Sequence, residues 1–415
     1  MNRRVVITGM GAVTPVGCTV DTYWDNLKNG VSGIDYLKKF DTTDFKVKIG
    51  AEIKDDFEWE KYVTKKDLKR NDMFTIYGVC AAVQALEDSG IDMEKEDALR
   101  VGVIVGSGIG GLPTLEDNVI RLHDKGPSKV SPLFVPMSIS NMAAGSISIR
   151  IGAKGMCEST VTACTSATNS IGNAYRNIKH GYADIIFAGG AEAAICGIGV
   201  AGFANLTALS TNENPKEACR PFDKNRDGFV MGDGAGILVL EEYEHAKKRG
   251  AKIYAEVVGY GATADAYHMT SPCPDGEGAA NAMLLAMQEA GITPEEVGYI
   301  NAHGTSTQAN DSGETAAIKR AMGEERAHKI PISSTKSMTG HLLAAAGAIE
   351  AIACIKALEE GFLPPTINYK DADEECDLDY IPNVGRKAED IKYALSNSLG
   401  FGGHNGVLCF KKWEE

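Results

Sequence analysis

One cysteine stands in a sequence context that could support acyl transfer. Residues 159–164 read Ser-Thr-Val-Thr-Ala-Cys, a run typical of a β-strand, and a helical pattern follows over residues 165–181. Cys164 is therefore predicted at a strand-to-helix turn, where unpaired backbone N–H groups carry partial positive charge. Such a turn should lower the pKa of the thiol, and the same N–H groups could hold an oxyanion. A buried structural thiol is the competing interpretation, because free cysteine is among the most buried residue types.

Two histidines follow short predicted strands. Residues 301–307 read Asn-Ala-His-Gly-Thr-Ser-Thr and come after an apolar segment, so His303 is predicted at a strand end, a common place for catalytic side chains. His341 closes the run Lys-Ser-Met-Thr-Gly-His and precedes a helical run at 342–358. We expect it in the first helical turn, where the helix dipole favours neutral imidazole. Either histidine alone could instead be a satisfied structural residue.

Together the three side chains match the needs of a decarboxylative condensation. A thiolate can take an acyl group as a thioester. Decarboxylation of a malonyl thioester then makes a carbon nucleophile, and its enolate oxygen needs hydrogen-bond donors. His303 and His341 could be those donors, and Lys336 could orient a histidine or a carboxylate such as Glu314.

The elements that would position these residues alternate between strands and helices. Strands are predicted at 4–8, 100–105, 183–188, 236–240 and 253–258, and a helix at 72–88. This alternation is typical of an α/β protein with a mostly buried sheet.

The chain also shows an internal echo. Residues 101–108, Val-Gly-Val-Ile-Val-Gly-Ser-Gly, resemble residues 297–304, Val-Gly-Tyr-Ile-Asn-Ala-His-Gly, and the segment starting at Arg4 resembles the one starting at Ala255. We predict two related halves, residues 1–250 with the cysteine and residues 251–415 with the two histidines. Coincidence is the alternative, because many βα units look alike.

Composition excludes several other classes of protein. The chain has 415 residues, 44% hydrophobic and 24% charged, which is enough for two core-bearing units. A net charge of −14 would repel a phosphate backbone, so no nucleic-acid partner is expected. No apolar stretch reaches the length of a membrane span, and Thr8 and Gly9 interrupt the one run that mimics a signal peptide. Ten scattered cysteines without a C-x-x-C pair fit reduced thiols in the cytoplasm and no zinc site.

Three loops imitate ligand-binding motifs and fail their patterns. Residues 223–228, Asp-Lys-Asn-Arg-Asp-Gly, open like an EF-hand loop, yet Gly234 stands where a bidentate glutamate is required, so no calcium site is predicted. The glycines of residues 106–111 lack the dinucleotide-binding spacing, and residues 400–403 lack the ending of a phosphate-binding loop.

The motifs taken together resemble those of the β-ketoacyl-[acyl-carrier-protein] synthases of bacterial fatty-acid synthesis, with type II members the most similar. The resemblance covers essentially the whole chain and rests on residues 162–166, 220–236, 301–307, 336–341 and 400–403. It implies a thiolase-like α/β fold with two similar halves in five α-β-α-β-α layers. It also implies a cytoplasmic homodimer that condenses malonyl-carrier protein with a Cys-bound acyl chain and so elongates fatty acids by two carbons.

The resemblance assigns roles to single residues. Cys164 is implied to be the nucleophile. His303 and His341 would assist decarboxylation and condensation, with Lys336 and Glu314 supporting them.

Further positions would shape the substrate site. The N–H groups of the nucleophile and of Phe401 would form the oxyanion hole, and Phe401 would gate the site. Thr305 and Thr307 would contact the phosphopantetheine arm. Ile109 and Phe203 would line an acyl pocket for medium and long chains. The family commonly has a threonine where this chain has His404, which leaves the detail of the gate loop open.

The resemblance also implies partners. Acyl carrier protein would bring phosphopantetheine, and no other cofactor would be required. A basic cluster would help dock the carrier, although a solvated helix start is the alternative: Lys65, Lys66, Lys69 and Arg70. The family can hold a monovalent cation, and the matching positions are Asn301, Glu350, Ser396 and Asn397.

Several related proteins remain as rivals. A degradative thiolase needs a second cysteine near the C-terminus, but Cys409 lies in a strand-like setting without the glycine-rich context of that role. An initiating synthase pairs cysteine with histidine and asparagine, whereas two histidine motifs are present here. A chain-length partner subunit would lack Cys164. A polyketide ketosynthase shares the chemistry and stays open.

Overall fold

Ten strands form one hydrogen-bonded sheet in the computed structural model of the chain, which describes residues 3–414. The order is β10-β9-β13-β14-β8-β1-β7-β6-β4-β5. The strands of its first half are β1 (Val5–Val13), β4 (Val101–Gly106), β5 (Cys157–Glu158), β6 (Ile185–Glu192) and β7 (Gly234–Glu242). Those of its second half are β8 (Ala255–Ala264), β9 (Val297–Asn301), β10 (Ile332–Ser333), β13 (Tyr393–Gly400) and β14 (His404–Lys412). Two short pairs lie apart: β2 (Asp35–Tyr36) with β3 (Ile49–Gly50), and β11 (Phe362–Leu363) with β12 (Arg386–Lys387).

The junction between β1 and β8 divides this sheet into two equivalent parts. Only three residue pairs join the two strands, from Val5 opposite Val257 to Ile7 opposite Ala255. Outward from that junction the order is β1-β7-β6-β4-β5 on one side and β8-β14-β13-β9-β10 on the other, so each strand has a counterpart.

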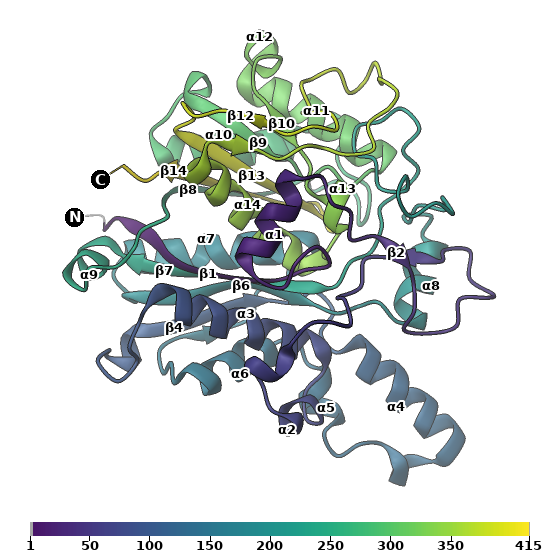
Figure 1. Ribbon diagram of the computed structural model, residues 1–415. Helices are drawn as coiled ribbons and strands as arrows, with labels where there is room; N and C mark the ends of the chain where they lie inside the picture. The colour runs from purple at the N-terminus through teal and green to yellow at the C-terminus, as the bar shows by residue number, and fades with distance from the viewer. Residues whose placement is uncertain (1–2, 415) are drawn as a thin grey trace.

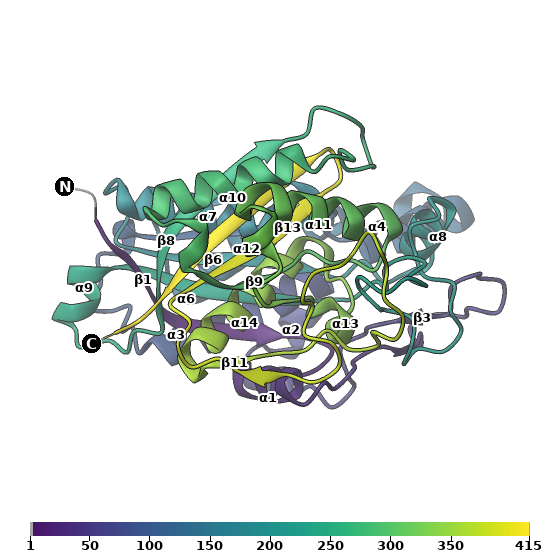
Figure 2. The ribbon, with the colours of Figure 1, turned by 90° about the horizontal axis from the view of Figure 1, so that it is seen from above.

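The helices complete five layers (Figure 1). α3 (Met73–Ser89) and α6 (Met142–Ile151) cover the outer face of the first five strands, and α7 (Ser166–Lys179) and α14 (Ala346–Glu360) lie between the two halves of the sheet. α10 (Glu277–Ala290) and α11 (Gln308–Met322) lie across the second five strands, as the view from above shows (Figure 2). The predicted five-layer α/β fold is therefore confirmed. The remaining helices are α1 (Val20–Lys28), α2 (Lys65–Leu68), α4 (Leu112–Lys125), α5 (Phe134–Ser138), α8 (Gly197–Asn205), α9 (Tyr243–Lys248), α12 (Glu324–Ala327) and α13 (Lys336–Thr339).

Local sequence explains where α3 begins and ends and why α14 can pack closely on the sheet. Asp72 caps α3 by accepting a hydrogen bond from the Phe74 N–H, and Gly90 ends it in the left-handed conformation at φ 63°. α14 is buried from Ala346 to Leu358 because both halves of the sheet pack on it. Its alanines allow that close packing. Within residues 3–414, no helix combines the length and the apolar character that a bilayer span requires.

The two halves repeat fine details of backbone packing. A Cβ at Gly11 would lie 1.9 Å from the Ala81 carbonyl oxygen of α3, and a Cβ at Gly261 would lie 1.9 Å from the Ala282 oxygen of α10. These helices therefore approach β1 and β8 equally closely, which only glycine permits. A second repeat is a non-glycine residue with positive φ ahead of each central helix, namely Ala163 at 51° and Leu343 at 47°. The division expected at residue 250 falls between α9 and β8 and stays a prediction.

Two predicted boundaries are wrong. The strand expected at 159–164 is confined to Cys157–Glu158, and the chain then turns into a 3₁₀ turn, η4 (Ala163–Thr165). The Thr162 N–H donates to the Ser166 hydroxyl at 2.9 Å, and that hydroxyl donates to the Ala163 carbonyl at 2.7 Å. These side-chain bonds replace strand pairing. Likewise, the helix expected from 342 begins at Ala346, after a 3₁₀ turn, η6 (Leu343–Ala345).

Candidate active site

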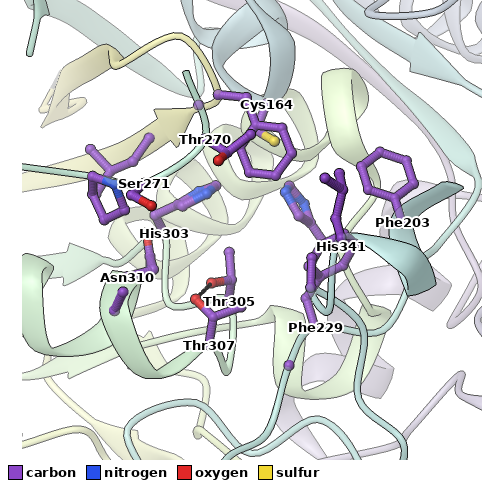
Figure 3. A pocket seen from close by; sticks show the side chains of 18 of the residues that line it. Cys164, Phe203, Phe229, Thr270, Ser271, His303, Thr305, Thr307, Asn310 and His341 are labelled. Atoms are coloured by element: carbon purple, nitrogen blue, oxygen red, sulfur yellow. Dashed lines mark hydrogen bonds between the residues drawn. The ribbon is translucent and has the colours of Figure 1, made fainter. Parts of the chain in front are cut away.

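The cysteine and both histidines meet in one cavity of about 390 Å³ (Figure 3). The Cys164 sulfur and one nitrogen from each ring of His303 and His341 lie within 4.8 Å of one another. Cys164 comes from the first half of the chain, whereas both histidines come from the second. The cavity is also lined by Phe203, Phe229, Thr305, Thr307, Leu343 and Phe401.

Cys164 lies in the turn η4, directly before α7 and against the loop after β13. A Cβ at Gly400 would lie 3.2 Å from the Cys164 nitrogen, and the Phe401 N–H donates a hydrogen bond to the sulfur. Burial raises the pKa of the Cys164 thiol to about 12, against the lowering effects of Lys336 and of the Phe401 N–H. The predicted fall in the thiol pKa is therefore wrong, because desolvation outweighs the favourable dipoles. The resting cysteine is a thiol whose proton must leave when sulfur attacks.

The two imidazoles are neutral at neutral pH. Burial and the charge of Lys336 hold the pKa of His303 and of His341 well below the ordinary value, and for His303 the neighbouring His341 adds to the effect. A neutral ring can donate one hydrogen bond and accept another. His341 follows Gly340 and precedes η6, so it is not in a helical turn as predicted. The neutral imidazole that we expected is present, but burial and Lys336 cause it rather than a helix dipole.

A buried ion pair stands behind His303. The Lys336 Nζ contacts the Glu350 carboxylate and lies 3.3 Å from the His303 Nδ1. An ammonium can only donate, so Nδ1 accepts and the ring proton lies on Nε2. The sequence led us to expect Lys336 beside a histidine or a carboxylate such as Glu314. The structure gives it a histidine and a different carboxylate.

Glu314 holds the backbone of His303 rather than its ring. Its two carboxylate oxygens accept hydrogen bonds from the N–H groups of His303 and Gly304, both at 2.8 Å. The Asn397 amide adds a third donor at 3.2 Å. Burial raises the pKa of Glu314 to about 7. The carboxylate thereby fixes the point where the chain leaves β9.

The remaining predicted pocket residues separate into two groups. Thr305 and Thr307 line the cavity with their hydroxyl oxygens 3.0 Å apart (Figure 3), and the ring of Phe203 lies 6.4 Å from that of Phe401 between centroids. Ile109 is not among the lining residues, and the residue is 38% exposed. The structure therefore brings Phe203 to the cavity but not Ile109.

The predicted cation and docking residues lie outside the cavity lining. Asn301 and Ser396 are opposite each other in β9 and β13. Among residues 3–414, several buried atoms of this group lack a hydrogen-bond partner: Asn301 Oδ1 and Nδ2, Glu350 Oε2, Ser396 Oγ and Asn397 Oδ1. The docking side chains are all exposed, in α2 or just after it: Lys65, Lys66, Lys69 and Arg70.

Sequence reasoning missed Glu192, at the end of β6. Its buried carboxylate accepts hydrogen bonds from the Ser107 hydroxyl at 2.9 Å and from the N–H groups of Gly108 and Ile109 at 2.9 and 3.3 Å. Burial raises its pKa to about 7, and its charge raises the pKa of Cys164. A glutamate that ends a fully apolar strand was the available signal. Phe229, whose ring meets His341 at 5.3 Å between centroids, gave none.

Comparison with known proteins identifies the family. Two family models match, described as beta-ketoacyl synthase, N-terminal domain, over residues 2–246 and C-terminal domain over residues 254–370. The chain is 54% identical over 411 residues to 3-oxoacyl-[acyl-carrier-protein] synthase 2 of Vibrio cholerae, with 99% of each chain covered.

Two solved structures extend this similarity to three dimensions. A beta-ketoacyl synthase from Burkholderia phymatum is 37% identical with a TM-score of 0.90, covering 99% of this chain and 100% of that one. A type II polyketide ketosynthase, solved in complex with its acyl-carrier protein, is 38% identical with a TM-score of 0.92, covering 100% of both chains. This chain therefore belongs to the β-ketoacyl synthase family.

Proposed function

We propose that this chain is a 3-oxoacyl-[acyl-carrier-protein] synthase of type II, an acyltransferase that condenses malonyl-carrier protein with an acyl chain held on Cys164. The observation that carries the proposal is the convergence of the Cys164 sulfur with a nitrogen from each of two neutral imidazoles. The 54% identity to a curated relative of that name, with 99% of each chain covered, supports it.

The first half-reaction transfers the acyl group to the enzyme. His341 can take the thiol proton, because neither of its ring nitrogens has another partner in the described part of the chain. The sulfur of Cys164 attacks the thioester carbonyl, and the carbonyl oxygen becomes negative while the N–H groups of Cys164 and Phe401 stabilise it. The carbon–sulfur bond to the phosphopantetheine then breaks, and its thiolate takes up the proton.

The second half-reaction forms the new carbon–carbon bond. The Nε2–H of His303 and the N–H of His341 donate to the thioester oxygen of the malonyl group. The bond to the carboxylate breaks, CO₂ leaves, and the electron pair becomes an enolate. Its carbon attacks the acyl carbonyl on Cys164, the bond to sulfur breaks, and the Cys164 thiolate takes up a proton from water. Neutral rings suit this role, because each retains one N–H to donate.

The substrate arrives on acyl carrier protein. Thr305 and Thr307 line the cavity, where their hydroxyls can contact the phosphopantetheine arm. The exposed basic cluster offers positive charge to a carrier, on a chain that is otherwise acidic: Lys65, Lys66, Lys69 and Arg70. No cofactor beyond the carried phosphopantetheine is needed for these steps.

A monovalent cation fits beside the ion pair. Buried oxygens of Asn301, Glu350, Ser396 and Asn397 lack partners within residues 3–414, and unpartnered buried oxygens are costly. Oxygen-only ligands suit a hard cation. A melting temperature that rises with K⁺ but not with choline at equal ionic strength would support this site, and equal melting temperatures would contradict it.

The active unit is a cytoplasmic homodimer. β5 pairs only with β4 in the described sheet, so one of its edges is free to extend the sheet of a second copy. Apolar side chains cluster on the elements near that edge, with Ile149 81% exposed and Val161 55% exposed. Sedimentation at the mass of a single 44.2 kDa chain would contradict the dimer.

Rival functions fit the site less well. A thiolase would need a second reactive cysteine, and Cys409 is buried in β14 away from the cavity lining. A chain-length partner subunit would lack the thiol that stands here. A role in polyketide synthesis is supported by the 38% identity to a solved polyketide ketosynthase. The 54% identity to a curated 3-oxoacyl-[acyl-carrier-protein] synthase 2 is higher and favours fatty-acid synthesis.

The deciding experiment is intact-protein mass spectrometry. The protein is mixed with acyl-carrier proteins of several chain lengths and then with malonyl-carrier protein. We expect an acyl adduct on Cys164 that disappears as a product two carbons longer forms. No adduct with any donor would contradict the proposal.

A further inference from the structure

The segment that imitates a calcium loop has a different task. Both of its terminal carboxylates are occupied by backbone or side-chain donors. Asp223 accepts hydrogen bonds from the N–H groups of Lys370 and Asp371 at 2.7 and 2.8 Å. Asp227 accepts from the Ser210 hydroxyl at 2.7 Å and from the Thr211 N–H at 3.0 Å. The segment therefore binds protein rather than a cation.

Arg226, inside this segment, is a fully buried cation with its side chain 0% exposed. Its Nε donates to the Thr307 carbonyl at 3.2 Å, and its Nη2 donates to the Gln308 carbonyl at 3.1 Å. Its Nη1 donates to the Asp223 carbonyl and to the Asp373 carboxylate. One planar guanidinium thus donates hydrogen bonds to two successive carbonyls of the turn that follows His303.

The same segment surrounds the rest of that turn. The Gly228 N–H donates to the Ser306 carbonyl, and the Arg220 N–H donates to the Ser306 hydroxyl, both at 3.0 Å. The Gln308 side chain donates back to the Arg226 carbonyl at 2.6 Å. Ser306 itself has φ 71°, a conformation that serine avoids unless its surroundings impose it. Residues 220–228 therefore hold the backbone of residues 305–308 together with Asp311, whose carboxylate accepts a hydrogen bond from the Ser306 N–H at 3.1 Å.

We infer that Arg226 is a positioning residue for the pantetheine arm: its fork fixes the turn that presents the Thr305 and Thr307 hydroxyls to the cavity. This inference rests on the proposed function, which makes those hydroxyls the contacts for the arm. Lysine at this position would keep the positive charge beside Asp373 and Asp311. It would lose the paired hydrogen bonds to the two carbonyls, because an ammonium lacks the planar arrangement of donors that a guanidinium has.

The test compares Arg226→Lys with a matched control, Arg249→Lys. Arg249 is a mostly buried arginine that binds both oxygens of Glu241 at 2.7 Å and the Ser89 carbonyl, and it does not line the cavity. Acylation of Cys164 by an acyl-pantetheine thioester is followed by intact mass over a range of concentrations. For Arg226→Lys we expect the half-saturating concentration to rise about tenfold, with the limiting rate within about twofold of the native protein.

A probe without an arm separates positioning from general damage. Alkylation of Cys164 by iodoacetamide should proceed at the native rate in Arg226→Lys, and both measurements should be native in Arg249→Lys. The milder Asp373→Asn, which removes one anchor of the guanidinium, should raise the half-saturating concentration in the same direction by a smaller factor. This variant serves if Arg226→Lys does not fold.

The outcomes distinguish the inference from the function beneath it. If native protein is acylated and both Arg226→Lys and Asp373→Asn saturate as native protein does, the inference is overturned. A fall in alkylation parallel to the fall in acylation would overturn it as well, because Arg226 would then support the whole site. If native protein takes no acyl group at all, the proposed function fails first and the inference with it.

Discussion

The ring of His303 meets the ring of His341 edge-on, with centroids 5.2 Å apart and planes at 84°. A nitrogen from each ring lies within 4.8 Å of a nitrogen of the other, so both can approach a single oxygen atom bound between them. Both rings are neutral, so both can donate to that oxygen while it gains charge.

Replacing His303 with alanine should separate the two half-reactions. The variant has no side-chain N–H to donate in place of Nε2–H, so release of CO₂ from malonyl-carrier protein should fall about 10²- to 10³-fold. Acylation of Cys164 should stay within about threefold of native, because His341 remains to take the thiol proton. Labelled CO₂ and intact mass measure the two steps, and an equal loss in both would contradict this division.

Cys164→Ala should abolish condensation completely. No thioester can form without the sulfur, so intact mass should show no acyl adduct. Cys409→Ala is the control, since that thiol is buried in β14 and should be dispensable for activity. Retained condensation in the first variant would refute the covalent route.

Lys336→Met should destabilise the protein by about 3–5 kcal/mol, because Glu350 would be left buried and unpaired. Adding Glu350→Gln should restore most of that loss, since the second change removes the orphaned charge. Chemical denaturation of the two single variants and the double variant measures the cycle. Additive losses would mean that the pair is not coupled as its geometry indicates.

Alkylation of Cys164 should accelerate about tenfold for each pH unit from 7 to 10 without reaching a plateau. Only the thiolate reacts, and burial raises the thiol pKa to about 12. Glu192→Gln should speed the reaction above pH 7, where native Glu192 is charged and raises the thiol pKa. The difference should shrink below pH 7, where Glu192 is protonated. Peptide mapping reports Cys164 alone, and a plateau near pH 8 would contradict the raised pKa.

Charge reversal of the docking cluster should weaken the use of acyl-carrier protein but not of a substrate that consists of the pantetheine arm alone. In Lys69→Glu with Arg70→Glu we expect the KM for acyl-carrier protein to rise about tenfold at low salt. The KM for acyl-pantetheine should equal that of the native protein, because neither side chain lines the cavity. An unchanged KM for the carrier would move the docking surface elsewhere.

Motifs of the sequence pointed to Cys164, His303 and His341, and the structure brings the three side chains into one cavity, although only His303 closely follows an apolar strand, β9. The layered fold follows from the same alternation and from the family resemblance. The role of Arg226 could not be predicted, since it binds backbone groups more than 80 residues away along the chain. Glu192 also acts at that separation, and its only signal was a glutamate at the end of an apolar strand. The pKa of Cys164 was mispredicted for a similar reason: the turn was visible in the sequence, but the depth of burial depends on the packing of both halves.

The two positive-φ residues ahead of the central helices stand at equivalent places in the two halves. Ala163 introduces Cys164, and its counterpart Leu343 introduces Ala344, whose N–H is bound by the Glu192 carboxylate. The two halves therefore contain the same backbone turn ahead of the central helix, and only the turn of the first half carries a nucleophile. In the second half the backbone N–H at the equivalent position donates to the Glu192 carboxyl group, and the same carboxyl group holds the loop at residues 107–109 beside the turn that carries Cys164.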